Sequence, residues 1–134
     1  NCRFNAIPTR GILVTARGKI RIHDNEFTNV AMANVFISND ANDWYESGPV
    51  RDVEIYNNKF IVTENNLPKS IDCSAILVQP ITFGGKVTAP VHKNIYIHSN
   101  YFDVRRDRVI TAHGVENLRT EDNEYKNIST VKIN

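Results

Sequence analysis

The sequence predicts an all-β fold, a right-handed parallel β-helix of about four to five coils, because it contains a repeat with a constant internal order. An alternating apolar segment that ends in Asn, a variable residue and an aromatic residue occurs four times, and a shorter apolar segment alternates with it. Together with Phe4 near the start of the chain, the aromatic ends recur at steps of 23, 33, 42 and 23 residues. Such a short basic repeat leaves no room for a strand–helix unit with ordinary connections, but it fits one coil of a parallel β-helix.

The two segment types predict the strands of each coil, one continuous strand for each segment. The longer segments are KIRIHDNEF, VEIYNNKF, IYIHSNYF and NLRTEDNEY, at residues 19–27, 53–60, 95–102 and 117–125. The shorter segments are GILVT, NVFIS, AILVQ and RVITA, at residues 11–15, 34–38, 75–79 and 108–112. We therefore treat residues 1–134 as a single β-helix domain.

Each longer segment carries an asparagine and, two positions later, an aromatic residue. The asparagines are predicted to stack at one turn of successive coils, about 4.8 Å apart, where their amides can bond along the stack and satisfy backbone groups. The aromatic residues are predicted to form a second stack in the interior. The two predicted stacks contain Asn25, Asn58, Asn100 and Asn123, and Phe27, Phe60, Phe102 and Tyr125.

Composition excludes two classes of partner. The formal net charge is +1, with no basic stripe or charge run, so a nucleic-acid partner is not predicted. No apolar run approaches the roughly 18 residues of a membrane helix, so membrane insertion is not predicted either. The chain starts inside a repeat and ends without a capping helix, which predicts a piece of a longer β-helix protein whose open ends favour self-association.

Two long insertions, at residues 39–52 and 80–94, leave the same corner of adjacent coils and are predicted to form a cleft wall. Alignment of the shorter segments on their apolar triplets gives columns of residues that meet across coils. The predicted columns are Thr15, Ser38, Gln79 and Ala112; Ala16, Asn39, Pro80 and His113; and Arg17, Asp40, Ile81 and Gly114. Asp40 then lies one coil from Arg17, whose guanidinium favours the ionised carboxylate. A surface ion pair is the alternative interpretation.

Two runs, RGILVTARGKIRIHDNEF at residues 10–27 and VFISNDANDWYESGPVRDVEIYNNKF at residues 35–60, resemble the β-helix of the family 110 glycoside hydrolases. These are bacterial α-1,3-galactosidases that act on blood-group-B-type and related linear α-galactosides. The resemblance covers roughly residues 8–60 and rests on the T-x-R-G-K turn and the D-A-x-x-W-[YF]-E-S-G-P-V run. It implies an inverting hydrolase of galactose-terminated glycans, with no metal or organic cofactor, in a periplasmic or secreted location.

The resemblance also implies that carboxylates at the coil face carry out the reaction. The family pattern has an Asp-Asp pair at the start of the first insertion, where this chain has Asn39-Asp40. It has an acidic residue after an Asn-Pro-like step on the next coil, where this chain has Gln79-Pro80-Ile81. Inverting hydrolysis needs one ionised and one protonated carboxyl group about 6.5 to 9.5 Å apart. One carboxylate of this pattern is therefore kept in the chain.

Candidate site residues lie in the first insertion and in the neighbouring columns. Asp40 suits the ionised base, and the candidate proton donors are Asp43 and Glu46, with loop-closing turn chemistry as the alternative for Glu46. Trp44 offers a ring face to the apolar side of galactose, with a packed loop anchor as the alternative. The candidate substrate-binding residues are Asn39, Trp44, Arg17, Arg10, Gln79 and His113.

The remaining histidines show no metal-ligand spacing. His23, His92 and His98 lie near strands, and we interpret them as surface histidines or as histidines with satisfied hydrogen bonds. No phosphate-binding loop, Ser-His-Asp arrangement or Cys/His metal motif is visible, so no metal site is predicted.

Three kinds of function remain open. The first is an α-galactoside hydrolase, or the active-site portion of one. The second is a carbohydrate-binding module that has lost part of its carboxylate set, which Asn39 and Ile81 favour. The third is a structural β-helix segment of a larger protein. A calcium-dependent lyase would need carboxylates stacked on neighbouring coils, and the columns offer only Asp40.

Overall fold

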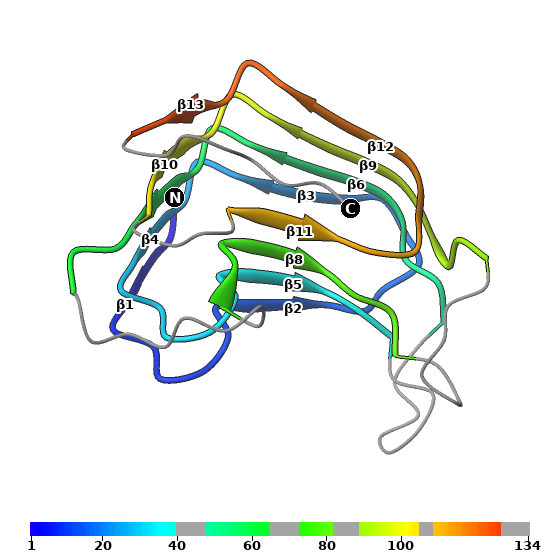
Figure 1. Ribbon diagram of the computed structural model, residues 1–134, viewed down its shortest axis with the longest axis horizontal. Coiled ribbons are helices and arrows are strands. Elements are labelled where there is room, and N and C mark those ends of the chain that lie inside the picture. Colours follow the sequence, from blue (N-terminus) through cyan, green and yellow to red (C-terminus); the bar gives the residue numbers. More distant parts are fainter. Residues whose placement is uncertain (40–47, 65–72, 82–88, 105–108, 127–134) are drawn as a thin grey trace.

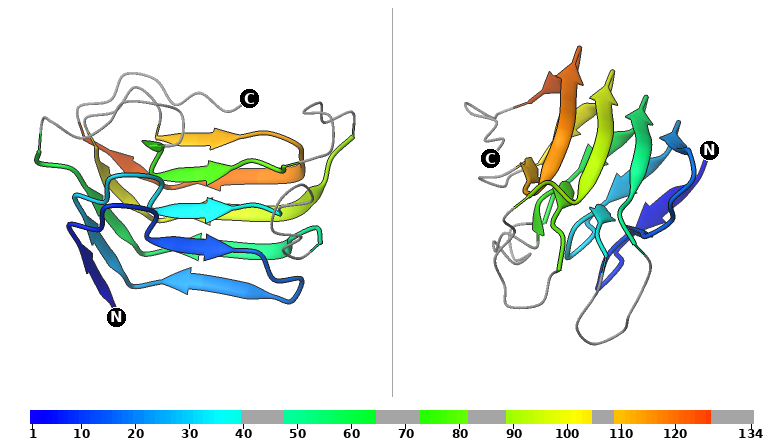
Figure 2. Two further views of the ribbon diagram at one scale, coloured as in Figure 1. Left: turned by 90° about the horizontal axis from the view of Figure 1, so that it is seen from below. Right: turned by 90° about the vertical axis from the view of Figure 1, so that its right-hand side faces the viewer.

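The computed structural model is an all-β parallel β-helix (Figure 1), and it describes residues 1–39, 48–64, 73–81, 89–104 and 109–126. In these residues the strands form three parallel sheets, and the chain visits the three sheets in turn on each coil. Figure 2 shows the strands of each sheet stacked along the solenoid axis. The predicted fold class is thus confirmed. Within the same residues, no helix is long and apolar enough to cross a membrane.

Four three-strand coils are complete within the described residues, and β13 begins a further one. The first sheet contains β1 (Arg3–Asn5), β4 (Glu26–Thr28), β7 (Lys59–Ile61), β10 (Tyr101–Asp103) and β13 (Glu124–Tyr125). The second sheet contains β2 (Ile12–Val14), β5 (Val35–Ile37), β8 (Ile76–Val78) and β11 (Ile110–Ala112). The third sheet contains β3 (Ile20–His23), β6 (Arg51–Tyr56), β9 (His92–His98) and β12 (Val115–Glu121).

Each longer segment of the sequence forms two strands, and the prediction of one continuous strand per segment is wrong. The segment at residues 19–27, for example, runs along β3 in the third sheet, turns, and continues as β4 in the first sheet. The turn arises because the residue before each stacked asparagine has a positive φ, which bends the chain out of the extended conformation. These residues are Asp24 (56°), Asn57 (54°), Ser99 (54°) and Asp122 (52°).

The predicted asparagine stack is confirmed and holds this turn. The Asn58 Nδ2 donates to the carbonyl oxygens of Ile22 at 2.8 Å and Tyr56 at 3.0 Å. Its Oδ1 accepts from the backbone N–H of Asn25 at 3.0 Å. The same pattern repeats at Asn100, whose Oδ1 accepts from the backbone N–H of Asn58 at 3.0 Å. Each asparagine therefore satisfies backbone groups of its own coil and of the preceding one.

The predicted aromatic stack is also confirmed and forms the centre of the interior. Consecutive rings along the axis are nearly parallel, with centroid distances of 4.6, 5.0, 4.9 and 5.3 Å from Phe4 to Tyr125. The three central rings, Phe27, Phe60 and Phe102, have no exposed surface. Aliphatic side chains of all three sheets fill the space around them.

The strand alignment of the fourth coil differs from the prediction by one residue. Ala112 pairs with Val78 rather than with Gln79, so His113 lies beside Gln79 rather than beside Pro80. The prediction started the apolar triplet of residues 108–112 at Val109 and so placed Thr111 beside Val78. In the structure Thr111 lies in register with Leu77, buried, with its hydroxyl 2.8 Å from the Ser74 hydroxyl. The hydrogen bond satisfies this buried hydroxyl in the middle of the strand.

Candidate functional site

Both long insertions begin and end at the corner between the second and third sheets. At their starting ends, Ile81 N–H donates to the Asn39 carbonyl at 3.1 Å. At their returning ends, Lys93 N–H donates to the Val50 carbonyl at 3.1 Å. The two insertions thus start and finish side by side on adjacent coils. Their cleft is still a prediction, because residues 40–47 and 82–88 lie outside the described part of the chain.

Four of the candidate residues belong to the first of these segments. They are Asp40, Asp43, Trp44 and Glu46, all outside the described residues. Their roles, and the column that joins Asp40 to Arg17, therefore stay predictions. The other candidates, Asn39, Arg17, Arg10, Gln79 and His113, are described.

Two buried amide oxygens mark the point where the chain leaves β5 and β8. The Asn39 side chain is 8% exposed, and its Nδ2 lies 3.4 Å from the Ile81 carbonyl oxygen. The Asn39 Oδ1 and the Gln79 Oε1 are both buried and accept no hydrogen bond from the described residues. A buried acceptor without a donor costs about 1 to 3 kcal/mol, so each oxygen would gain from a hydroxyl placed against it. The corner thus carries two acceptors that no described residue satisfies.

Backbone hydrogen bonds fix the positions of these amides. Gln79 N–H donates to the Ile37 carbonyl at 3.0 Å, and the Ser38 hydroxyl donates to the Gln79 carbonyl at 2.8 Å. One coil further on, His113 N–H donates to the Val78 carbonyl at 2.9 Å and brings the half-buried His113 next to Gln79. Asn39, Gln79 and His113 therefore lie at one corner, on successive coils.

Arg17 belongs to the same corner, whereas Arg10 does not. The Arg17 guanidinium packs so closely on Gly48 that a Cβ at residue 48 would collide with it. Gly48 lies at the returning end of the first insertion, so Arg17 contacts that insertion from the preceding coil. The Arg10 guanidinium instead lies 4.9 Å from the ring centre of Phe36, on the side where β2 begins. That is the opposite end of the second sheet from the corner.

His92 is a corner residue that the sequence analysis interpreted wrongly. It has no exposed surface, and its Nδ1 accepts a hydrogen bond from the Val50 N–H at 3.1 Å. A neutral ring that accepts at Nδ1 carries its proton on Nε2. The Nε2 is buried and has no partner among the described residues. No motif or spacing in the sequence distinguishes this histidine from the surface ones.

Burial keeps His92 neutral, because it lowers the pKa of the imidazole to about 4. In the unfolded chain a histidine has a pKa of about 6.5, so acid protonates the unfolded state first. Stability is then complete above pH 6.5 and falls as the pH drops toward 4. We expect the free energy of unfolding to decrease by about 2 kcal/mol between pH 7 and pH 5 from this group.

Urea denaturation at both pH values checks this expectation, with His92→Gln as the matched variant. The variant should lose the His92 contribution to the pH dependence, while the contributions of the other three histidines cancel in the comparison. Equal pH dependence in the two proteins would contradict the assignment.

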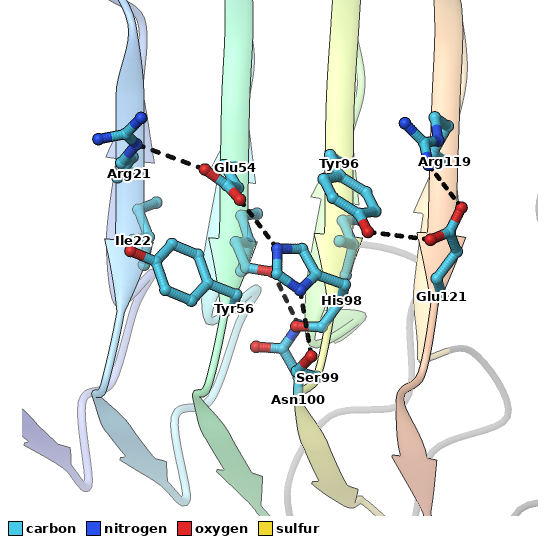
Figure 3. A network of polar contacts seen from close by, with 12 residues as sticks. Arg21, Ile22, Glu54, Tyr56, Tyr96, His98, Ser99, Asn100, Arg119 and Glu121 are labelled. Atoms are coloured by element: carbon cyan, nitrogen blue, oxygen red, sulfur yellow. Dashed lines mark hydrogen bonds and ion pairs between the residues drawn. The ribbon is translucent and has the colours of Figure 1, made fainter.

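His23 and His98 agree with their interpretation as surface or satisfied histidines. His23 is exposed and stacks on Tyr56 at 4.9 Å. The His98 Nε2 lies 2.9 Å from a Glu54 oxygen (Figure 3), and this hydrogen bond is the main reason why the pKa of Glu54 is lowered. Among the residues that the structure describes, no group of three or more histidine, cysteine, aspartate or glutamate side chains is arranged to hold a metal ion.

Comparisons with known proteins show similarity between the chain and parts of α-1,3-galactosidases. No protein-family model matches the chain. The chain is 38% identical over 97% of its length to a protein of Peterkaempfera griseoplana named α-1,3-galactosidase A, covering 17% of that protein. It is 34% identical over 98% of its length to the α-1,3-galactosidase A of Bacteroides thetaiotaomicron, covering 22% of it. It is 38% identical over 92% of its length to the α-1,3-galactosidase A of Shewanella woodyi, covering 19% of it.

The chain thus spans about a fifth of the length of the relatives that it matches, with shares of 17 to 22%. The matched part includes nearly all of its coils and both insertions. The chain is therefore a parallel β-helix segment that is similar to part of several α-1,3-galactosidases.

Proposed function

We propose that the whole protein is an inverting α-1,3-galactosidase of the family 110 type, which releases terminal α-galactosyl residues from glycans. The observation that carries this proposal is the similarity to α-1,3-galactosidases along nearly the whole chain, at 38% identity over 130 residues. The corner supports it, because the insertion that carries Asp40, Asp43 and Glu46 starts and ends there.

In this proposal the first insertion supplies the reacting groups. Asp40 is the base that activates water, and Asp43 or Glu46 is the acid that protonates the leaving oxygen. Trp44 stacks on the apolar face of galactose. The remaining corner residues bind hydroxyl groups through amide, imidazole or guanidinium atoms: Asn39, Gln79, His113 and Arg17. Arg10 is left out, because its guanidinium lies on Phe36.

The test is hydrolysis of an α-1,3-galactosyl disaccharide by the whole protein, with the product anomer followed by NMR. Release of β-galactose is expected, and the Asp40→Asn variant should abolish it. Asp103→Asn is the matched control, because Asp103 pairs with Lys126 at 3.4 Å on the first sheet, away from the corner. Release of α-galactose, or full activity of Asp40→Asn, would contradict the proposed mechanism.

The amide at residue 39 favours a second candidate, a galactoside-binding module without hydrolysis. The resemblance places a carboxylate here, whereas Asn39 presents an amide with Nδ2 on the Ile81 carbonyl. Saturable binding of the disaccharide in calorimetry, with no galactose released, would select this candidate. Neither binding nor release would leave only a structural role for the β-helix.

The contact between Arg17 and Gly48 gives a second prediction for the site. Gly48→Ala should displace the Arg17 guanidinium and lower kcat/KM about tenfold, since a small displacement of a positioning group costs about this much or more. The stability should change by less than about 1 kcal/mol, because the displaced atoms are the end of a flexible, exposed side chain.

Gly18→Ala is the control for this prediction, because a Cβ at residue 18 meets no atom within 4 Å. Activity assays and urea denaturation on the three proteins separate the two effects. Unchanged kcat/KM in Gly48→Ala would mean that Arg17 does not serve the site.

A further inference from the structure

A groove lies across the first residues of three neighbouring strands of the third sheet. It has a volume of about 350 Å³ and crosses β3, β6 and β9. Its polar lining consists of Lys19, Arg21, Asp52, Glu54, Asn94 and Tyr96. This volume is at the lower end of the range of small-ligand clefts, about 300 to 1,000 Å³.

The groove begins where the corner site ends. Lys19, Asp52 and Asn94 come two residues after Arg17, Val50 and His92, respectively. Those three corner residues border the returning ends of the insertions, as the contacts of Gly48 and Val50 show. A chain molecule whose end occupied the corner would therefore meet the groove next.

The lining suits an uncharged ligand with many hydroxyl groups. Two cationic side chains, Lys19 and Arg21, lie beside two anionic ones, Asp52 and Glu54, on the next strand, and the Arg21 Nε lies 3.4 Å from a Glu54 oxygen. Asn94 Nδ2 donates to Asp52 at 2.8 Å, and its Oδ1 accepts from Asn117 at 2.9 Å. The groove thus presents both donors and acceptors without an excess of either charge, which favours neither an anionic nor a cationic ligand.

Tyr96 gives the groove one rigid wall. Its hydroxyl donates to the Glu121 carboxylate at 2.9 Å, as Figure 3 shows. Its ring stacks on His98 at a centroid distance of 4.2 Å, and the Arg119 guanidinium lies 4.6 Å from its ring centre. A side chain held on several sides loses little further freedom when a ligand binds, so its contacts count fully toward affinity.

We infer that this groove binds the sugar units that follow the terminal galactose, so that the protein prefers oligosaccharides to simple galactosides. The inference rests on the proposed function, because it takes the corner as the place of the terminal galactose. It assigns the groove to the part of the glycan that leaves after hydrolysis.

The test compares two ligands of the whole protein, methyl α-galactoside and a tetrasaccharide that ends in α-1,3-linked galactose. The wild-type protein should have a lower KM, or a lower Kd in calorimetry, for the tetrasaccharide. Tyr96→Ala should raise that constant about tenfold, a loss of about 1.4 kcal/mol, and leave kcat and the constant for the methyl galactoside within about twofold. Tyr96→Phe should retain most of the preference.

Tyr56→Ala is the matched control, because Tyr56 stacks on His23 and His98 of the same sheet but does not line the groove. Lys19→Ala replaces an exposed residue of the same groove, and it is the variant to compare with the wild type if Tyr96→Ala fails to fold. A wild-type protein that treats both ligands alike, or equal effects of Tyr96→Ala and Tyr56→Ala, would overturn the groove assignment alone. A protein that neither binds nor hydrolyses either ligand would overturn the proposed function as well.

Discussion

Replacing Phe60 with alanine should lower the free energy of unfolding by about 4 kcal/mol, in the range of buried phenylalanine truncations. Phe60 has no exposed surface and stacks between Phe27 at 5.0 Å and Phe102 at 4.9 Å. The variant loses apolar burial, two ring contacts worth about 0.5 to 1.5 kcal/mol each, and leaves a cavity at the axis of the solenoid. Because the neighbouring rings are fixed by their own coils, the cavity cannot collapse easily.

Urea denaturation of the wild type and three variants measures this effect. Phe60→Leu keeps most of the volume and should cost about 1 to 2 kcal/mol. Phe4→Ala should cost less than Phe60→Ala, because Phe4 is half-buried and stacks on one ring. A decrease in the free energy of unfolding of less than about 1 kcal/mol for Phe60→Ala would show that the aromatic stack contributes little to the stability of the core.

Asn58→Ala should lower the free energy of unfolding by about 3 kcal/mol, since it leaves several buried polar groups without partners. The Nδ2 of Asn58 donates to the Ile22 and Tyr56 carbonyls, and its Oδ1 accepts from the Asn25 N–H. Asn58 is 1% exposed, so solvent cannot replace these bonds. The turn that joins the third and first sheets then loses its hydrogen bonds on two coils.

Lys59→Ala is the neighbouring control and should change the stability by less than about 0.5 kcal/mol, because Lys59 is exposed. Asn58→Asp should be as harmful as Asn58→Ala at neutral pH, since a carboxylate cannot donate to two carbonyl oxygens. If Asn58→Asp retained wild-type stability, the donor role of the amide would be wrong.

The sequence predicted the architecture well, because the side chains that stack are also the ones that repeat. Asn25, Asn58 and Phe60 recur at the same place in each coil, and the hydrogen bonds and ring contacts confirm their stacking. The break of each longer segment into two strands was missed, because a single residue of positive φ, such as Asn57, leaves no signature in apolar periodicity. The alignment of the fourth coil was missed because Val109 is as apolar and buried as the strand residues, although the paired strand starts at Ile110.

The site was harder to predict than the fold, for a physical reason. The positions of the corner residues follow from where the insertions start and end. Asn39, Gln79 and Arg17 could therefore be placed from the strands that flank them. The buried His92 accepts a hydrogen bond from the Val50 N–H of the adjacent coil, and no local pattern encodes that contact. Arg10 could not be excluded before its contact with Phe36 was known.

The unequal lengths of the coils have a consequence for how such a protein can acquire new specificity. Successive members of the asparagine stack are separated by 33, 42 and 23 residues, and Asn25 follows Cys2, whose N–H it accepts, by 23 residues, yet the hydrogen bonds between coils are nearly identical. Doubling a flexible loop costs only about 0.6 kcal/mol of closure entropy, so extra residues at the corner burden the fold little. The asparagine stack restores the alignment of the strands after every insertion. Loops at the corner can therefore be lengthened or exchanged one coil at a time, while the stacked strands of the β-helix stay the same.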